Sequence, residues 1–484
     1  MKKKISSEIK KIILENIESS TSHGFPNIVR NESFILKLMW TLCLLVSSGY
    51  CAYCLTKSFQ DYFSYETDTQ MKFKRVSQIE FPTVTFCNKF AADLNKGNWL
   101  SELAKYGYKE LKLSLSDLTK FNEFFKEIDY NFKYESLKFK DNFNLVGFDI
   151  DKMLLNCNFN FKECNSSNFK FFLSSIFGFC YQFNADKTNI RKVSSPGKQA
   201  GLSLELFIGY PNKDYDLYKS YGAHLFIHNS STIPSSEFDG ISLSTGHETD
   251  IIVSKTFFQK LSKPYSDCVK DLNSTESFGS EVYKETIKIF GQYEQKVCIN
   301  LCFHKSVFER CGCYYPDQKI IKNISQACDH SFGFKCYLDF AASFGESKIS
   351  SECIDKCPEQ CQSVKYNLQF SNANFPTPSY ADFFIAYDSE INNNLRSFYS
   401  YSNVKESTLA VNVYFDDIGY TLVEEKASKT LEQLVADIGG FLGLCIGISI
   451  LSIAEIFDSI LKIILLFFQK KNDSIVKKHL KNFN

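Results

Sequence analysis

The sequence predicts an α+β membrane protein in which two transmembrane helices flank a large, disulfide-rich extracellular domain. Three observations predict this class: an apolar stretch near each end of the 484-residue chain, basic residues outside both stretches, and 18 cysteines that lie mostly between them. Structural disulfides do not persist in a reducing compartment, so this many cysteines favours the cell exterior. A hydrophobic content of 44% and a charged content of 23% exclude a disordered chain.

The first apolar stretch, 34–55, has about the 20 residues that a helix needs to cross the hydrocarbon core. A cleaved signal peptide is the alternative. It fits poorly, because the preceding arm 1–33 is too long and no small-residue cleavage site follows. The second apolar stretch, 430–468, is longer than one crossing requires, and it contains charged side chains: Asp437, Glu455, Asp458 and Lys462.

Positive and negative residues balance at 55 each, so no overall field attracts nucleic acid. Basic residues concentrate in the arm 1–33 and in the tail 469–484, which by the positive-inside rule are both cytoplasmic. We therefore expect a multi-pass protein of the plasma membrane with residues 56–429 outside the cell. The glycosylation sequons agree with this topology: Asn165, Asn229, Asn273 and Asn323.

The second stretch is patterned for contact with water. At 100° per residue, one stripe of a helix holds Asp437, Gly440, Leu444, Gly447, Leu451, Glu455, Asp458 and Lys462. A charge at the bilayer centre costs roughly 2.5 to 3.5 kcal/mol, so the stripe is expected to line a wet path. One such helix cannot enclose a pore, and several copies around an axis can. The alternative, glycines that serve helix packing alone, leaves the acidic residues unexplained.

Motifs along nearly the whole chain resemble the degenerin/epithelial sodium channel family. Gly447-Ile448-Ser449, after 437–444 (DIGGFLGL), resembles the Gly-x-Ser signature of its pore helix. His23-Gly24 resembles its cytoplasmic His-Gly motif, and 81–88 (FPTVTFCN) its signature after the first span. Further matches are 178–184 (GFCYQFN), 264–268 (PYSDC) and the last palm strand with its link, 407–430.

The resemblance implies a trimeric, amiloride-sensitive sodium channel whose extracellular domain has palm, finger, knuckle, thumb and β-ball regions. The thumb is expected at about 265–366, and finger helices at 101–140. The implied pore residues are the filter Gly447, Ile448 and Ser449, its support His23 and Gly24, the blocker site Gly440, the outer acidic ring Asp437, and the inner acidic residues Glu455 and Asp458. Neutralising Asp437 is expected to weaken external divalent block.

The cysteine spacing predicts a ladder. Cys298 and Cys302 lie four apart, and Cys353, Cys357 and Cys361 repeat this step, so two antiparallel stripes pair in nested order. The predicted pairs are Cys268–Cys361, Cys298–Cys357, Cys302–Cys353, Cys311–Cys336 and Cys313–Cys328. By the resemblance, Cys87 pairs with Cys180 and Cys157 with Cys164. The alternative is a zinc cluster of Cys298, Cys302, His304, Cys311 and Cys313.

Other two-span classes remain as alternatives. An ATP-gated channel shares the topology and lacks the Gly-x-Ser signature. An adhesion or scavenger receptor has no reason to keep acidic residues on one stripe. The sequence contains neither a catalytic signature nor a phosphate loop, so we expect no enzyme and no cofactor.

The gating stimulus is expected to be an extracellular neuropeptide, as in the peptide-gated sodium channels of Hydra, which the compact extracellular domain resembles. A proton gate is less favoured, because 63–68 lacks the histidine that acid-sensing relatives carry there. The bulk of Gln433 favours a third option, a constitutively open pore. By the resemblance, Tyr65 and Tyr265 are expected to stack and to couple the thumb to the gate. The alternative is that each tyrosine belongs to the aromatic belt at the membrane interface. The expected partners are sodium ions, with calcium as a further candidate, and sister subunits in a homotrimer or heterotrimer.

Overall fold

The computed structural model describes residues 18, 24–89, 148–174, 178–209, 220–230, 232, 234, 240–314, 328, 332–391 and 400–481. The predicted finger helices at 101–140, His23 and Asn323 lie outside these residues. The chain forms two compact units. One unit consists of Met1–Asp68 and Glu425–Asn484, and the other of Thr69–Glu424.

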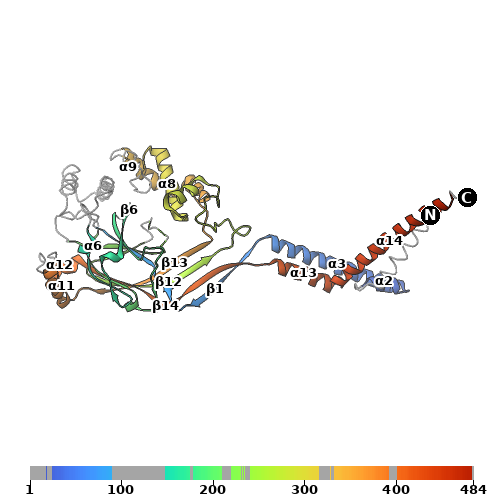
Figure 1. Ribbon diagram of the computed structural model, residues 1–484, viewed down its shortest axis with the longest axis horizontal. Coiled ribbons are helices and arrows are strands. Elements are labelled where there is room, and N and C mark those ends of the chain that lie inside the picture. The colour runs from blue at the N-terminus through green and yellow to red at the C-terminus, as the bar shows by residue number, and fades with distance from the viewer. Residues whose placement is uncertain are drawn as a thin grey trace. The chain divides into compact units, whose positions relative to one another are not determined.

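A seven-stranded sheet forms the centre of the second unit, in the order β13-β12-β14-β9-β4-β5, with β1 paired to β14 (Figure 1). β12 runs parallel to β14, whereas β13–β12, β14–β9, β9–β4 and β4–β5 are antiparallel. The strands are β1 (Thr67–Arg75), β4 (Leu154–Phe159), β5 (Lys162–Glu163), β9 (Leu202–Phe207), β12 (His247–Gln259), β13 (Gln362–Asn374) and β14 (Thr408–Ala427).

A five-stranded sheet has the order β11-β10-β3-β7-β6, and β2 pairs with β8. The core forms because alternate residues of the strands are apolar: Leu202, Leu204 and Leu206 of β9 are buried with Val411 and Val413 of β14. These strands are β2 (Ile79–Glu80), β3 (Thr83–Asn88), β6 (Phe169–Ser174), β7 (Gly178–Phe183), β8 (Lys192–Val193), β10 (Ala223–His228) and β11 (Ile241–Leu243).

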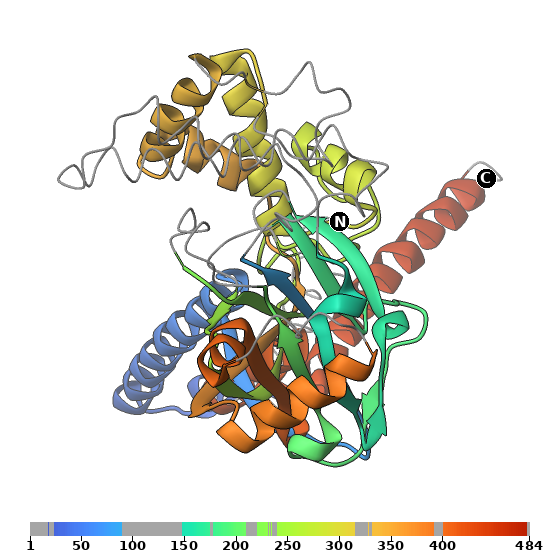
Figure 2. The same cartoon turned by 90° about the vertical axis from the view of Figure 1, so that its left-hand side faces the viewer.

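Short helices cover one end of the large sheet. Helices α11 (Pro378–Ile391) and α12 (Tyr401–Ser407) lie beside the strand ends, in orange at the front of Figure 2. Phe384 and Val404 bury themselves against Phe207 and Ala410 of the sheet. The remaining short elements are α6 (Ile150–Met153), η3 (Ser166–Asn168) and η4 (Lys198–Ala200).

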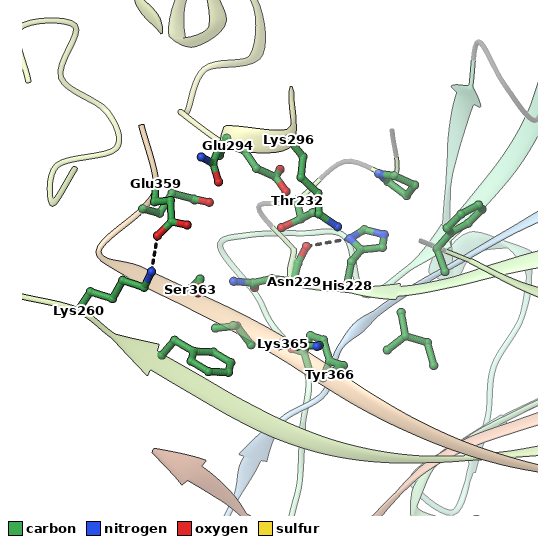
Figure 3. Close-up of a pocket in the computed structure, with 17 residues that line it drawn as sticks. His228, Asn229, Thr232, Lys260, Glu294, Lys296, Glu359, Ser363, Lys365 and Tyr366 are labelled. Carbon is green, nitrogen blue, oxygen red and sulfur yellow. Dashed lines mark hydrogen bonds and ion pairs between the residues drawn. The ribbon is translucent and has the colours of Figure 1, made fainter. Parts of the chain in front are cut away.

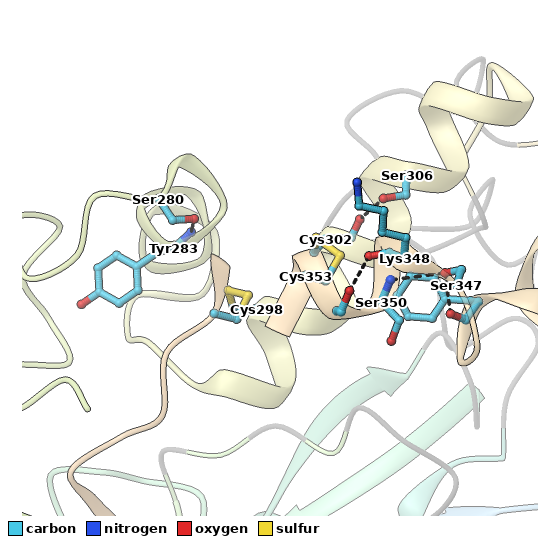
Figure 4. The surroundings of a disulfide bond; sticks show 12 residues. Ser280, Tyr283, Cys298, Cys302, Ser306, Ser347, Lys348, Ser350 and Cys353 are labelled. Carbon is cyan, nitrogen blue, oxygen red and sulfur yellow. Dashed lines mark hydrogen bonds between the residues drawn. A yellow bond between two sulfur atoms is a disulfide. The ribbon is translucent and has the colours of Figure 1, made fainter. Parts of the chain in front are cut away.

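Four helices form a further group: α7 (Glu281–Phe290), α8 (Gln295–Cys311), α9 (Phe332–Phe344) and α10 (Lys348–Lys356). Disulfides link α8 to α9 and α10, whereas α7 packs against α8 through a buried cluster that contains Tyr283 and Cys298. α8 carries Cys298 and Cys302 on consecutive turns, and Cys302 is bonded to Cys353 of α10 (Figure 4). The structure contains all seven pairs named above, Cys87–Cys180 and Cys157–Cys164 included. The cysteines of the zinc alternative are therefore not available as thiolates.

The first unit contains α2 (Phe25–Arg30), α3 (Phe34–Phe63), α13 (Leu431–Ile446) and α14 (Ile450–Lys481). α3 is long and apolar enough to span a membrane, and it continues to Phe63, beyond the predicted end at 55. α13 and the first part of α14 pass the same test only as a pair that is bent by 75°.

The bend makes one prediction wrong. The polar stripe was placed on one straight helix, but α13 carries Asp437, Gly440 and Leu444, and α14 carries Leu451, Glu455, Asp458 and Lys462. A helical wheel keeps its phase only while each residue adds 100°, and Gly447 leaves the helical conformation with φ 74° and ψ 21°. Within α14, Asp458 forms an ion pair with Lys462 at 2.6 Å.

Candidate ion-conduction site

Gly447 ends α13. Its φ of 74° lies in the left-handed region, which costs glycine little and other residues more. Its backbone N–H donates to the carbonyl of Gly443 at 3.0 Å, and the N–H of Ile448 donates to the carbonyl of Leu442 at 3.2 Å. These bonds close the last turn of the helix as glycine caps do.

Ser449 begins α14. Its Oγ accepts from the backbone N–H of Ser452 at 3.3 Å, and its own N–H donates to the Oγ of Ser452 at 3.1 Å. This reciprocal pattern is a capping box made from two serines. In the segment Gly447-Ile448-Ser449, the glycine therefore caps the end of α13, Ile448 links the two helices, and Ser449 caps the start of α14. Irregular backbone at membrane depth is tolerated where it lines a cavity or is buried in protein.

Polar atoms connect α13 to α3 in one antiparallel row. The Oγ of Ser47 donates to the carbonyl of Cys445 at 2.6 Å, and the Sγ of Cys51 donates to the carbonyl of Phe441 at 3.7 Å. Farther along, the Oγ of Ser58 donates to the carboxylate of Asp437 at 3.0 Å. Small and polar side chains are the usual contacts between membrane helices.

Asp437 has a second partner, Lys429. The Nζ of Lys429 lies 2.7 Å from Oδ2 of Asp437 and donates to the Oγ of Ser58 at 2.8 Å. Ser58 is 4% exposed, and the side chains of Lys429 and Asp437 are 15% and 40% exposed. We call these three residues the outer polar contact. Spacing rules missed Lys429, because it precedes α13 and lies eight residues from Asp437.

Gln433 serves a local role at the start of α13. Its Oε1 accepts from the N–H of Thr430 at 2.8 Å, while the Oγ1 of Thr430 accepts from the N–H of Gln433 at 3.2 Å. This capping box is worth about 1 kcal/mol to the helix. The bulk of Gln433 therefore has an explanation that does not involve an open pore.

The glycines of α13 contact no other element of the described chain. A Cβ added at Gly439, Gly440 or Gly443 has no described atom within 4 Å beyond its own helix and chain neighbours. The face that contains Gly440 is thus open in a single subunit. Gly24, by contrast, has a φ of 91° and lies against α3, where its Cβ would meet Leu44 at 3.1 Å.

The two tyrosines of the predicted coupling belong to different units, and their contact stays a prediction. Tyr65 follows α3 with a φ of 52°, and its ring lies 6.4 Å from the ring of Phe63 and 6.5 Å from that of Tyr62. Tyr265 lies in a turn, where its N–H donates to the carbonyl of Ser262 at 3.2 Å.

A cavity of about 750 Å³ separates the start of α8 from the large sheet (Figure 3). Its wall carries charges of both signs, from Glu294, Lys296 and Lys365 and from the ion pair Lys260–Glu359. Phe258 and Tyr366 add aromatic rings. Cavities of this size hold small ligands. No sequence pattern predicts this cavity, because its wall combines segments between 226 and 366.

Three of the described histidines differ in their surroundings. Burial and the nearby Lys89 lower the pKa of His224 to about 4. His228 lies within hydrogen-bonding distance of Thr85 Oγ1, at 2.7 Å, and of the Asn229 carbonyl, at 2.8 Å. His304 is buried in α8.

Three of the four predicted glycosylation sites lie among the described residues, and they differ in exposure. Asn165 and Asn273 are exposed. Asn229 is half-buried, and its side chain lines the cavity of about 750 Å³ and an adjacent one of about 490 Å³.

Relatives of this chain are subunits of epithelial sodium channels. The gamma subunit of Neoceratodus forsteri is 27% identical over 321 residues, which cover 65% of this chain and 46% of the relative. The alpha subunit of Homo sapiens is 28% identical over 316 residues, which cover 64% and 45%. The chain thus aligns with less than half the length of these relatives.

A solved structure of a proton-activated chloride channel aligns with 89% of this chain and 96% of that chain, at 6% identity and a TM-score of 0.31, which is too low to support an argument. The family model described as "Amiloride-sensitive sodium channel" matches residues 17–458. That span includes α3, both sheets, the disulfide-bonded helices and the break at Gly447. The chain belongs to the amiloride-sensitive sodium channel family.

Proposed function

We propose that this chain is a subunit of a sodium-permeable cation channel of the plasma membrane and is not an enzyme. The observation that carries the proposal is the break at Gly447-Ile448-Ser449. It separates α13 from α14, two largely apolar helices that carry a few charged side chains, and it lies within residues 17–458, which the family model matches. Both termini are cytoplasmic, and three subunits surround the pore. The open glycine face of α13 supports assembly, since it leaves room for the helices of neighbouring subunits.

Ions pass the break, where three residues outside regular helix present backbone carbonyls and the Ser449 hydroxyl in place of hydration water. His23 and Gly24 support this filter from the cytoplasmic side, and Glu455 and Asp458 line the inner pore. We expect sodium to permeate better than potassium. The test is Ser449→Leu, with Ser459→Leu as a control on the same helix. A reversal potential that Ser449→Leu leaves unchanged contradicts the filter assignment.

Amiloride binds from outside at Gly440, below the outer ring of Asp437. The exposed position of Gly440 supports this, because a cation needs access to the face on which it binds. We expect Gly440→Ser to raise the amiloride concentration for half block, whereas Gly439→Ser, its neighbour on the helix, changes it less. Equal block of both variants and of the unaltered channel contradicts the site.

The gate responds to an extracellular neuropeptide, and thumb movement reaches it through Tyr65 and Tyr265. The low pKa of His224 and the helix-capping role of Gln433 both weaken the alternatives, a proton gate and a constitutively open pore. The cavity beside α8 offers carboxylates to a guanidinium and aromatic rings to a phenyl group, which suits an amidated Arg-Phe peptide.

The experiment is to record from oocytes that express the chain alone and with sister subunits, first with acid steps and then with amidated RFamide-type peptides. Glu359→Gln is expected to raise the peptide concentration for half activation without changing sodium selectivity. Glu352→Gln is the matched control, because Glu352 also pairs with a lysine, Lys348, and does not line the cavity. Acid-evoked current without a peptide response refutes peptide gating, and resting current that amiloride blocks supports the open-pore alternative.

A further inference from the structure

We propose that Lys429 determines the divalent-cation sensitivity of the pore mouth, because it compensates the charge of Asp437 within each subunit and holds α13 on α3. The inference rests on the proposed channel function and adds a residue that neither motif nor spacing identified. It concerns only the outer polar contact of Ser58, Lys429 and Asp437, which lies within one compact unit.

The three polar groups of this contact all bond to one another. The Nζ of Lys429 lies 2.7 Å from the Asp437 carboxylate and 2.8 Å from the Ser58 hydroxyl, which itself donates to that carboxylate at 3.0 Å. Each pair of the three groups is therefore in hydrogen-bond contact. Ser58 is contributed by α3, Asp437 by α13, and Lys429 by the segment that leads from β14 into α13.

The burial of the lysine distinguishes this contact from an ordinary surface ion pair. Its side chain is 15% exposed, whereas surface pairs such as Lys263–Asp267 have both side chains more than three-quarters exposed, at 78% and 84%. Water competes less for a buried ammonium group, so the pair persists at physiological salt. Asp437 itself is 40% exposed, so cations can reach it once the lysine is removed.

The ligand preference of divalent cations predicts that the lysine prevents their binding at Asp437. Carboxylate oxygens are the ligands that calcium and magnesium prefer, and a ring of uncompensated aspartates around a pore mouth is a divalent site. With Lys429 in place, each Asp437 contributes little net charge. Divalent block at this position is then a property that the lysine suppresses. Neutralising Asp437 alone is therefore expected to change the block little, in contrast to the weakening that the family resemblance implies.

The first test measures external calcium block of sodium current. We expect Lys429→Gln to lower the calcium concentration for half block roughly fivefold, because each Asp437 carboxylate is then uncompensated and available to the divalent cation. Lys429→Arg is expected to leave it unchanged. Adding Asp437→Asn to Lys429→Gln is expected to reverse the effect. Unchanged block in Lys429→Gln, or weakened block in Asp437→Asn alone, overturns the proposal.

The second test needs no current. A zero-length carbodiimide treatment of the purified full-length chain is expected to join Lys429 to Asp437 through an amide, which mass spectrometry of the digested protein detects. Lys462 serves as the internal comparison, because its ion pair is with Asp458. An absent Lys429–Asp437 link overturns the contact. A link in a chain that conducts no current under any stimulus, either alone or with sister subunits, leaves the contact standing and contradicts the channel function instead.

Discussion

The extracellular unit and the membrane unit use their apolar residues in opposite ways. In the extracellular unit, Leu204 and Val413 lie on the paired strands β9 and β14 of the large sheet, are 1% and 0% exposed, and belong to one buried core. In the apolar window of α3 only 6% of the residues are buried, and Leu45 and Val46 are 63% and 74% exposed. One chain therefore completes its extracellular core and leaves its membrane surface to lipid and to other subunits.

The links that stabilise the two units also differ. The extracellular unit is stabilised by seven disulfides and its β-sheets, whereas the described polar contacts between α3 and α13 are single hydrogen bonds. Strong covalent links stabilise the part that has its own core. Weak links leave the helices free to change their packing, which a gate requires.

The largest difference between the regions is expected from matched leucine substitutions. Leu204→Ala removes a side chain from a filled core and is expected to cost about 3 kcal/mol, within the range measured for such cavities. Leu45→Ala on the exposed face of α3 is expected to change stability by less than about 0.5 kcal/mol. The measurement is thermal unfolding of the detergent-solubilised channel, followed by size-exclusion chromatography. Equal losses contradict the comparison.

The pH dependence of stability provides a second comparison, because His224 belongs to the extracellular unit. Since its folded pKa is about 4 and its unfolded value about 6.5, the unfolded chain binds the proton first. This group therefore lowers stability as pH falls from about 6.5 toward 4 and has no such effect above that window. We expect His224→Gln to flatten the pH dependence of the melting temperature there.

Lys89→Met provides the internal check for the histidine, because removing this charge takes away one cause of the low pKa. The pH dependence of its melting temperature is expected to lie between that of the unaltered chain and that of His224→Gln. A pH dependence that neither substitution changes shows that another group of the extracellular unit is responsible.

The smallest effect concerns glycans. Asn165 and Asn273 are exposed and are expected to accept them, whereas Asn229 lines two cavities that a glycan would fill. Asn165→Gln and Asn273→Gln should each remove one mobility step that glycosidase treatment also removes. A further step lost in Asn229→Gln contradicts the cavity assignment.

Much of this architecture is encoded locally, and for that reason it could be predicted. The first span follows from one uninterrupted apolar run, and the nested pairs from cysteines on consecutive turns. The motif at Gly447 and Ser449 predicts a filter, but these residues also cap the ends of two helices, so a stripe that assumes one straight helix does not continue through them.

The outer polar contact and the cavity could not be predicted, because each depends on where the chain returns in space. Ser58 and Asp437 are 379 residues apart in the sequence, and only the packing of α13 on α3 brings them together. No periodic pattern identifies Lys429, since the turn at the start of α13 sets its direction.

The nested disulfides also bear on how the protein is made. The five pairs between 268 and 361 enclose one another, with separations of 15, 25, 51, 59 and 93 residues, and no pair crosses another. Such an order resembles the stem of an RNA hairpin, which closes from its tip without threading. Each inner bond shortens the loop that the next must close, which lowers the entropy cost of that step. During oxidation in the secretory pathway, the disulfides of this region can therefore form in order from Cys313–Cys328 outward, without isomerase-driven reshuffling of crossed pairs.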